Sequence, residues 1–136
     1  MSALDENDSA LFNSAMMSDV TQDFNGQTRQ GIEAVRAHAL GVVGPLDSTH
    51  FVTNIRIDVE DDAANTATLT GNTLALHYPS GTGRSQSNRR LVGGSRHKVE
   101  MVKGAEDGLW KFQTWTIRTV WFEGDYSVMD GVLDEL

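Results

Sequence analysis

The sequence has no cysteine, and its 11 lysines and arginines are outnumbered by 19 acidic residues. Without cysteine there is no disulfide scaffold, no thiol nucleophile and no cysteine-based zinc site. The net charge of −8 argues against a nucleic-acid partner, because phosphate binding depends on lysine and arginine. No apolar run approaches the ~20 residues of a transmembrane helix, and no basic-then-apolar leader opens the chain. We expect a cytoplasmic protein without a membrane partner.

What the chain does contain is the composition of an ordinary globular protein. Apolar residues make up 39% and charged residues 22% of its 136 residues. A chain of this length buries roughly two-thirds of the surface that it exposes when unfolded. We therefore predict a single domain that spans residues 1–136.

The first third of the chain shows helical periodicity, with a short strand between two helices. A cap at residues 7–9 predicts a helix whose apolar face is formed by Leu11, Phe12, Ala15 and Met16. Residues 18–24 alternate as a strand and end at the turn pair Asn25-Gly26. A second helix ends at Gly44-Pro45 and has an apolar stripe formed by Ile32, Val35, Ala39 and Val42.

After Pro45 the sequence is rich in β-formers. We predict four strands, over Phe51–Val59, Thr66–Tyr78, Leu91–Val102 and Leu109–Phe122. The polar stretch 79–90 between the second and third strands reads as a loop. Helices followed by a long β-rich run indicate an α+β fold, in which N-terminal helices cover one face of a strongly bent antiparallel sheet and enclose a pocket.

His50 is the first candidate for a functional side chain, because it lies at the start of the stretch "HFVTNIRIDV". It can be a packing residue, a ligand or a catalyst, and periodicity alone favours a structural histidine that donates to a backbone carbonyl. The four histidines have neither H-x-H nor H-E-x-x-H spacing, which gives a metal site little support.

Other candidates depend on which way the strands face. Alternation places His97 with the apolar residues Val99 and Met101, and Arg96 on the opposite face. Arg118 interrupts the bulky last strand: pointing inward it can hold a carboxylate, phosphate or enolate oxygen, and pointing outward it is a solvated residue. Asn54 has an even offset from His50 and can share its face.

Three aromatic residues and one further histidine complete the candidates. Tyr78 can supply a phenol to the pocket or can lie at its rim. Phe24 and Phe112 are interpreted as pocket-lining residues. His38 falls between the apolar stripe and the exposed side of its helix, and we interpret it as a surface residue.

Four segments in register carry a resemblance to a known family: "ALDENDSALFNSAMMSDVTQDF", "GIEAVRAHAL", "STHFVTNIRIDV" and "GLWKFQTWTIRTVWFEGD". Together they resemble the SnoaL-like branch of the nuclear-transport-factor-2-like superfamily, near its scytalone dehydratases. The resemblance implies a cone-shaped fold with an internal cavity, and enzymes that work without metal or organic cofactor. The family also includes non-catalytic binding modules.

The resemblance assigns roles to particular residues. It makes His50 the general acid/base and Asp5 the carboxylate that orients it. A second catalytic histidine falls at Arg96 or His97. Two tyrosines of the dehydratases are replaced by Leu4 and Phe24, and an asparagine is replaced by Arg118. It also implies a full helix ahead of "LDENDS", where few residues are present.

We therefore predict a cofactor-independent dehydratase, isomerase or cyclase that acts on a hydrophobic, oxygenated, polyketide- or terpenoid-like metabolite. Hydrolysis is a further possible reaction. In this interpretation Arg118 and His97 polarise or anchor a substrate oxygen. The alternatives are a non-catalytic ligand-binding or dimerisation module and a scaffolding subunit. A homodimer is expected, or else a trimer, because the outer sheet face carries apolar residues.

Overall fold

The computed structural model describes residues 1–86 and 89–136 and contains one six-stranded sheet of strand order β2-β1-β6-β5-β4-β3. Part of the loop predicted over 79–90, at residues 87–88, lies outside the described residues. The elements, in chain order, are α1 (Ser2–Asp5), α2 (Ser9–Ser14), β1 (Met16–Phe24), β2 (Gln27–Gln30), α3 (Ile32–Val43), β3 (Asp47–Val59), β4 (Thr66–Tyr78), β5 (Leu91–Lys103), β6 (Trp110–Gly124) and the 3-10 segment η1 (Tyr126–Glu135).

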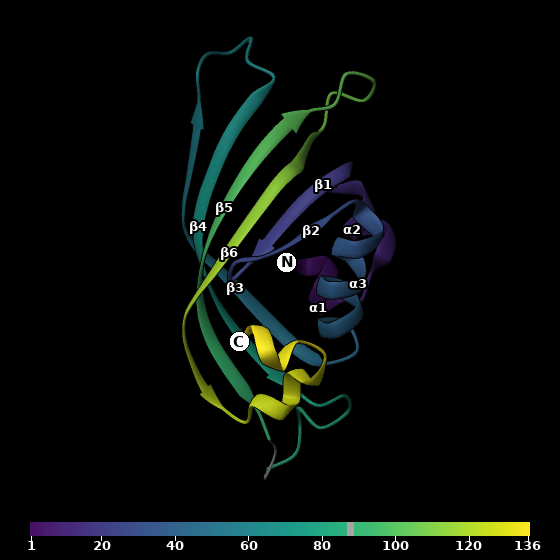
Figure 1. Ribbon diagram of the computed structural model, residues 1–136, viewed down its shortest axis with the longest axis vertical. Coiled ribbons are helices and arrows are strands. Elements are labelled where there is room, and N and C mark those ends of the chain that lie inside the picture. The colour runs from purple at the N-terminus through teal and green to yellow at the C-terminus, as the bar shows by residue number, and fades with distance from the viewer. Residues whose placement is uncertain (87–88) are drawn as a thin grey trace.

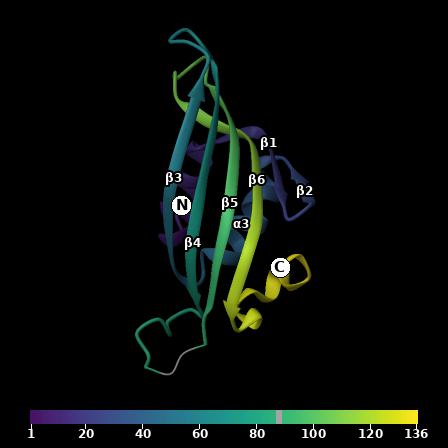
Figure 2. The ribbon, with the colours of Figure 1, turned by 90° about the vertical axis from the view of Figure 1, so that its left-hand side faces the viewer.

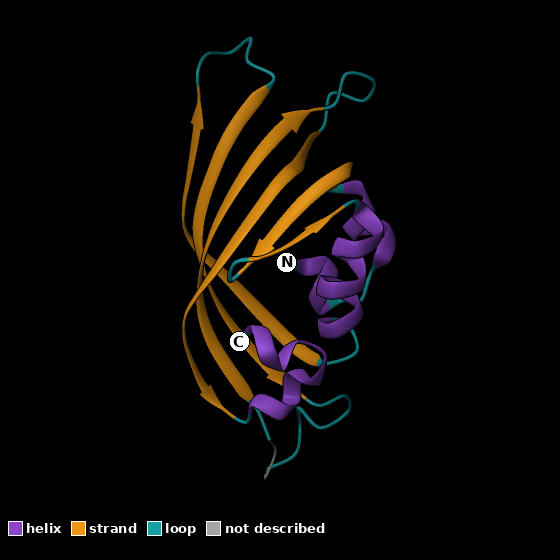
Figure 3. Ribbon diagram, in the orientation of Figure 1, coloured by secondary structure: helices purple, strands orange, loops and turns teal. Residues whose placement is uncertain are grey.

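The sheet is strongly bent and open, and the helices lie on its concave side (Figure 1, Figure 3). Seen from the convex side, β3 to β6 run almost parallel to the long axis of the molecule, with α3 behind them and η1 beside the end of β6 (Figure 2). Every neighbouring strand pair is antiparallel except β1 and β6, which pair in parallel. This architecture confirms the predicted α+β fold class.

The first predicted helix is shorter than its periodicity predicts, and the strand that follows it, β1, begins two residues earlier than predicted. The Asp8 side chain caps α2 by accepting a hydrogen bond of 2.9 Å from the backbone N–H of Leu11. However, α2 ends at Ser14, and Met16 begins β1 instead of continuing the helix. Leu11, expected on the apolar face, is 42% exposed. Met16 reaches the core from β1, with 7% exposure, whereas Leu11 does not.

The strand predictions for the second half are close to the observed bounds, with one consequence for the site. β4 covers the predicted residues Thr66–Tyr78. β3 begins at Asp47, four residues earlier than predicted, so His50 lies within the strand. Its partner across the ladder is Ala75, and Phe51 pairs with Leu74. His50 is therefore held by the pairing of β3, the edge strand of the sheet, with β4.

The core fills the space between the concave face of the sheet and the helices. Its buried hydrophobic residues include Leu4, Phe12, Val20, Val35, Leu40, Leu91, Val99, Trp115, Ile117 and Met129. On β4 burial alternates along the strand: residues 67, 71, 73, 75 and 77 are buried, whereas Asn72 and Leu74 are exposed. This period of two shows which side chains of β4 point into the concave side. No helix among the described residues is long and apolar enough to cross a bilayer.

Candidate active site

Asp5 and His50 are in direct contact on the concave side of the sheet. Asp5 ends the short helix α1, and its Oδ1 lies 2.6 Å from Nδ1 of His50 on β3. The same carboxylate accepts hydrogen bonds from the His50 backbone N–H at 3.0 Å and from the Ser48 hydroxyl at 2.9 Å. Three donors from one strand thus fix the carboxylate, and the carboxylate fixes the orientation of the imidazole.

The electrostatics of Asp5 favour its ionised form. Partial burial acts to raise the pKa of this carboxyl, but the hydrogen bonds from the His50 ring and backbone, the charge of His50 and the Ser48 hydroxyl together lower it. Asp5 is therefore ionised at neutral pH, and its carboxylate accepts a hydrogen bond from the Nδ1–H group of His50. This contact directs the other ring nitrogen, Nε2, away from Asp5.

The His50 ring lines a cavity of about 90 Å³ between the sheet and α3. All four histidines of the chain, His38, His50, His77 and His97, line this cavity. The remaining walls are largely apolar and include Leu4, Phe24, Ala39, Val43, Ala75, Trp115, Ile117, Phe122 and Met129. A second apolar cavity of about 280 Å³ shares Met1, Leu4, Thr73, His97 and Trp115 with the first.

His97 lies on the inner face of β5, as strand alternation predicts. The indole Nε1–H of Trp115 donates to its Nδ1 at 3.0 Å. Burial first, and the nearby His50 second, lower the pKa of His97 to about 4. The ring is therefore neutral at pH 7, and because Nδ1 accepts, its proton is on Nε2.

His77 lies next to His50, and the sequence analysis did not select it. The two rings meet edge to face, with centroids 5.1 Å apart and planes at 75°. His77 is only 3% exposed. The signal that identifies it is the alternation on β4, which places residue 77 in phase with residues 73 and 75, and Tyr78 on the opposite face. Tyr78 is therefore a wrong choice for a pocket residue, and His77 is the pocket residue of this pair.

His38 is also not the surface residue that its helical position predicts. Its side chain is 10% exposed, and its Nδ1 lies 2.8 Å from Oε1 of Gln22. Its Nε2 lies 3.1 Å from Oε2 of Glu135. Burial, and then the charge of Arg29, lower the pKa of His38, and Glu135 offsets part of that effect. His38 was misassigned because η1, which covers this side of α3, has no clear signal in the sequence.

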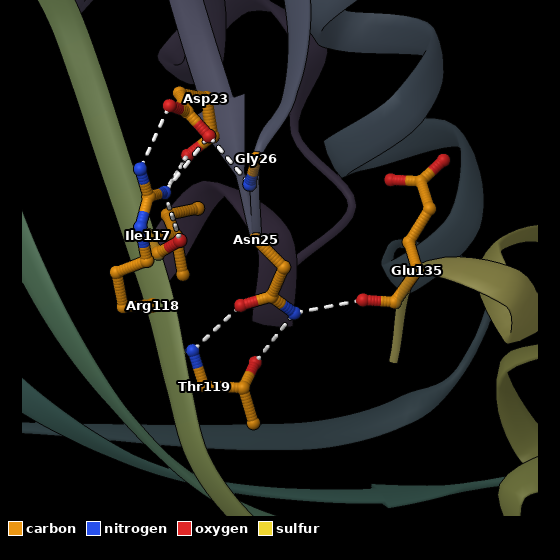
Figure 4. A network of polar contacts seen from close by, with 7 residues as sticks. All are labelled: Asp23, Asn25, Gly26, Ile117, Arg118, Thr119 and Glu135. Carbon is orange, nitrogen blue, oxygen red and sulfur yellow. Dashed lines mark hydrogen bonds and ion pairs between the residues drawn. The ribbon is translucent and has the colours of Figure 1, made fainter.

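The C-terminal segment η1 forms one wall of the cavity and is hydrogen-bonded to the β1–β2 turn. Asn25 donates from Nδ2 to the backbone carbonyl of Glu135 at 2.8 Å and to Oγ1 of Thr119 at 3.0 Å, and its Oδ1 accepts from the Thr119 N–H at 2.8 Å (Figure 4). The Glu135 side chain also forms an ion pair with Arg29. Through these contacts Met129, Val132 and Leu136 become walls of the cavity.

Arg118 lies on the outer face of β6, which corrects its predicted role. Its guanidinium forms two hydrogen bonds of 2.8 Å with the two carboxylate oxygens of Asp23 on β1 (Figure 4). Its neighbour Ile117 is the residue that faces the cavity. Arg118 cannot anchor a substrate oxygen beside His50, because the sheet lies between them. Its role is to link β6 to β1.

Arg96 and Asn54 are likewise misassigned as substrate-binding residues. Both border a shallow depression on the outside of the sheet, together with Arg118. Arg96 is out of phase with the inward-facing His97. Asn54 has a φ of +54° at the β3 irregularity between Thr53 and Arg56, which breaks the even offset from His50. The bulge could not be read from the strand pattern.

The two predicted aromatic residues occupy different places. Phe24, at the end of β1, lines the histidine cavity and packs edge to face against His38 with centroids 5.3 Å apart. Phe112 borders the second cavity and packs against Trp115. Within the described part of the chain, no three histidine, aspartate or glutamate side chains are grouped so that they could hold a metal ion.

The sequence of this chain is similar to a known domain family and to a known protein. The SnoaL-like domain family matches residues 1–116. The chain is 34% identical over 126 residues to the "Terrestric acid biosynthesis cluster protein E" of Penicillium crustosum, an alignment that covers 93% of this chain and 80% of that protein.

Two solved structures share the fold. A candidate scytalone dehydratase from Novosphingobium aromaticivorans has a TM-score of 0.74 at 20% identity, over 91% of this chain and 78% of that one. The hexachlorocyclohexane dehydrochlorinase LinA-type3 from Novosphingobium barchaimii has a TM-score of 0.70 at 22% identity, over 90% and 80%. At these identities the likeness establishes the fold alone.

Proposed function

Because this chain belongs to the SnoaL-like family, and because one wall of its cavity is formed by a histidine that is paired with an aspartate, we propose that it is a cofactor-independent acid/base enzyme of secondary metabolism. Its substrate is a hydrophobic, oxygenated metabolite of polyketide or terpenoid type. Dehydration or isomerisation through an enolate is the first reaction class, followed by cyclisation and hydrolysis. The biosynthetic-cluster relative supports the metabolic setting.

The observation that carries the proposal is the 2.6 Å contact between Nδ1 of His50 and Oδ1 of Asp5 at the wall of an apolar cavity. With its proton on Nδ1, a neutral imidazole presents the lone pair of Nε2 as a base. The ionised Asp5 holds that tautomer and stabilises the imidazolium that forms when Nε2 accepts a proton. An apolar cavity also excludes water from the reacting atoms.

In a dehydration, Nε2 of His50 takes the proton from the carbon next to a substrate carbonyl. The electron pair of the C–H bond moves to form the enolate, whose oxygen accepts a hydrogen bond from Nε2–H of the neutral His97. The enolate then forms the carbon–carbon double bond and expels the β-hydroxyl group. The His50 imidazolium returns its proton to this group, which leaves as water.

The test uses 4-hydroxy-4-phenylbutan-2-one, a β-hydroxy ketone, and follows both the absorbance of the conjugated enone and the exchange of its α-protons in D2O. Wild-type protein should catalyse exchange, and His50→Asn should reduce it by at least about a hundredfold. Arg118→Gln is the control, since Arg118 lies across the sheet from the cavity. Unchanged exchange in a folded His50→Asn variant would contradict the proposal.

The second candidate function is a ligand-binding module without chemistry. It is favoured by the replacement of two dehydratase tyrosines by Leu4 and Phe24, both of which line the cavity without a hydroxyl group. This alternative predicts that the wild-type protein binds the ketone but exchanges no α-protons. The exchange assay therefore separates the two candidates.

A further inference from the structure

The second apolar cavity, of about 280 Å³, has no role in the reaction proposed above. Its walls come from α1 and α2 on one side and from the sheet on the other. It meets the first cavity at Thr73, His97 and Trp115, which line both. Val52 and Ile55, on the edge strand β3, also line it and are 42% and 53% exposed. The second cavity therefore adjoins the first at one end and solvent at the other.

The first cavity is too small for the whole of a substrate of the proposed class. Its volume is about 90 Å³, whereas an apolar cavity of roughly 150 Å³ holds a molecule as small as benzene. It therefore has room for the reacting head of a polyketide- or terpenoid-like metabolite but not for its hydrocarbon part. The second cavity is about three times larger and is lined mainly by apolar side chains.

A buried hydroxyl group lies at the junction of the two cavities. Thr73, on the inner face of β4, is 5% exposed, and among the described residues its Oγ1 has no hydrogen-bond partner. Buried polar groups in native proteins are rarely left in this state, and each such group calls for an explanation. A ligand that spans both cavities passes this hydroxyl group and can accept its hydrogen bond.

Gly71, also on the inner face of β4, leaves space in the second cavity. It lies in the interior of a strand, where glycine weakens the strand and can mark the close approach of a ligand. Its φ is not positive, so the backbone does not require glycine. A Cβ atom here would make ordinary contacts, the nearest at 3.4 Å from the carbonyl oxygen of Thr53. Neither strain nor crowding therefore explains the missing side chain, whereas a ligand beside Gly71 does.

We propose that the second cavity is the binding subsite for the apolar chain of the substrate, and that Gly71 is a specificity-determining residue of this subsite. The substrate class is then an elongated, amphipathic compound. Its short oxygenated head lies at His50, and its hydrocarbon chain passes Thr73 into the space beside Gly71. This proposal rests on the proposed function of the His50 site, since it names the substrate class of that site.

The probes are pentan-2-one and nonan-2-one, which share a head and differ by four methylene groups. Each buried methylene group raises affinity by roughly fourfold, so NMR titration of the wild-type protein should show at least about thirtyfold tighter binding of nonan-2-one. Gly71→Leu, whose side chain would fill the space, should reduce this ratio to below about fivefold and leave pentan-2-one binding within about twofold. Asn72→Leu is the matched control, because it places the same side chain at the neighbouring position on the opposite, exposed face of β4.

An unchanged ratio in a folded Gly71→Leu variant would overturn the proposal. If Gly71→Leu does not fold, the methyl 13C resonances of the wild-type protein decide. Leu69 and Val99 line the second cavity but not the first, so their signals should move when nonan-2-one is added. No movement of either signal at saturation overturns the proposal equally.

The same probes separate this inference from the proposed function. His50→Asn should retain the preference for nonan-2-one while it loses α-proton exchange. If that variant keeps full exchange, the acid/base role of His50 fails, whereas the chain-length result for Gly71 stands by itself.

Discussion

The two faces of the bent sheet are opposite environments for ionisable side chains. On the concave face, His77 and His97 are enclosed, and the pKa of each is lowered to about 4. On the convex face, Arg118 is paired with Asp23, and that contact raises the pKa of the arginine and lowers that of the aspartate. One face favours uncharged hydrogen-bonding groups and the other favours charge.

The contrast is sharpest where neighbouring residues point to opposite sides. Arg96 and His97 are adjacent on β5, and Ile117 and Arg118 are adjacent on β6. Water stabilises the arginines, whereas desolvation dominates for the imidazole. One exception on the concave side is Asp5, which keeps its charge because three donors satisfy it. This charge beside the cavity is thus stabilised by a complete set of partners.

The largest effect on activity is expected from replacing Asp5. Asp5→Asn should reduce α-proton exchange by at least about a hundredfold, because an amide cannot stabilise the His50 imidazolium. It should also destabilise the fold by about 2 kcal/mol at pH 7. The NH2 group of asparagine cannot accept a hydrogen bond from the donor that it would face. Urea unfolding and the exchange assay measure the two effects.

Asp5→Asn should have a smaller effect on stability in acid. The folded pKa of Asp5 is lowered, so its stabilising contribution is present above the pKa of about 4 in the unfolded chain and is lost as the pH falls through the folded pKa. The wild-type and variant stabilities should therefore converge below pH 4. A constant difference between them would contradict an ionised Asp5.

The next effect concerns the uncharged histidines. In the unfolded chain His77 titrates near 6.5, and in the folded protein near 4, so protonation favours the unfolded state between these values. We expect His77→Leu to remove about 2 kcal/mol of the wild-type stability loss between pH 7 and pH 5. Urea unfolding across this range provides the measurement. Tyr78→Phe should keep the wild-type pH dependence, and a parallel curve for His77→Leu would refute neutral burial.

A smaller effect on activity is expected from changes on the convex face. Self-association through this face remains a prediction. Phe51 pairs with Leu74 and Gly94 with Trp121 across four strands, and the three large side chains are 55%, 38% and 46% exposed. We propose that this row contacts a second copy of the chain. Trp121→Glu should then lower the molar mass measured by light scattering from dimer to monomer while α-proton exchange continues. An unchanged mass would show that the row is not the contact.

The smallest effect is expected for the arginine–aspartate pair. Arg118→Gln should leave α-proton exchange within about twofold of the wild type, because the sheet separates Arg118 from the cavity and exposed ion pairs contribute little to stability. A large loss of activity would mean that the two faces are coupled through β6. The α-proton exchange assay would reveal such coupling.

Much of the fold could be predicted from local patterns. The alternation over residues 66–78 matches β4, and the inward direction of His97 follows from its phase with Val99. The same rule, applied to His77 and Tyr78, would have selected the histidine. In contrast, α1, β2 and η1 are too short or too irregular to leave a periodic signal, so the burial of His38 beneath η1 could not be anticipated.

The sequence by itself determined the order of the elements, the two sides of each regular strand and, through its resemblance to a family, the choice of Asp5 and His50. Only the tertiary structure decided that Asp5 meets a ring 45 residues away, that Arg118 faces solvent, and that four histidines share one cavity. The physical reason is that alternation defines two faces but does not say which face is concave. That depends on the bend of the sheet, on the bulge near Asn54 and on long-range packing. A local sequence pattern carries no information about any of these features.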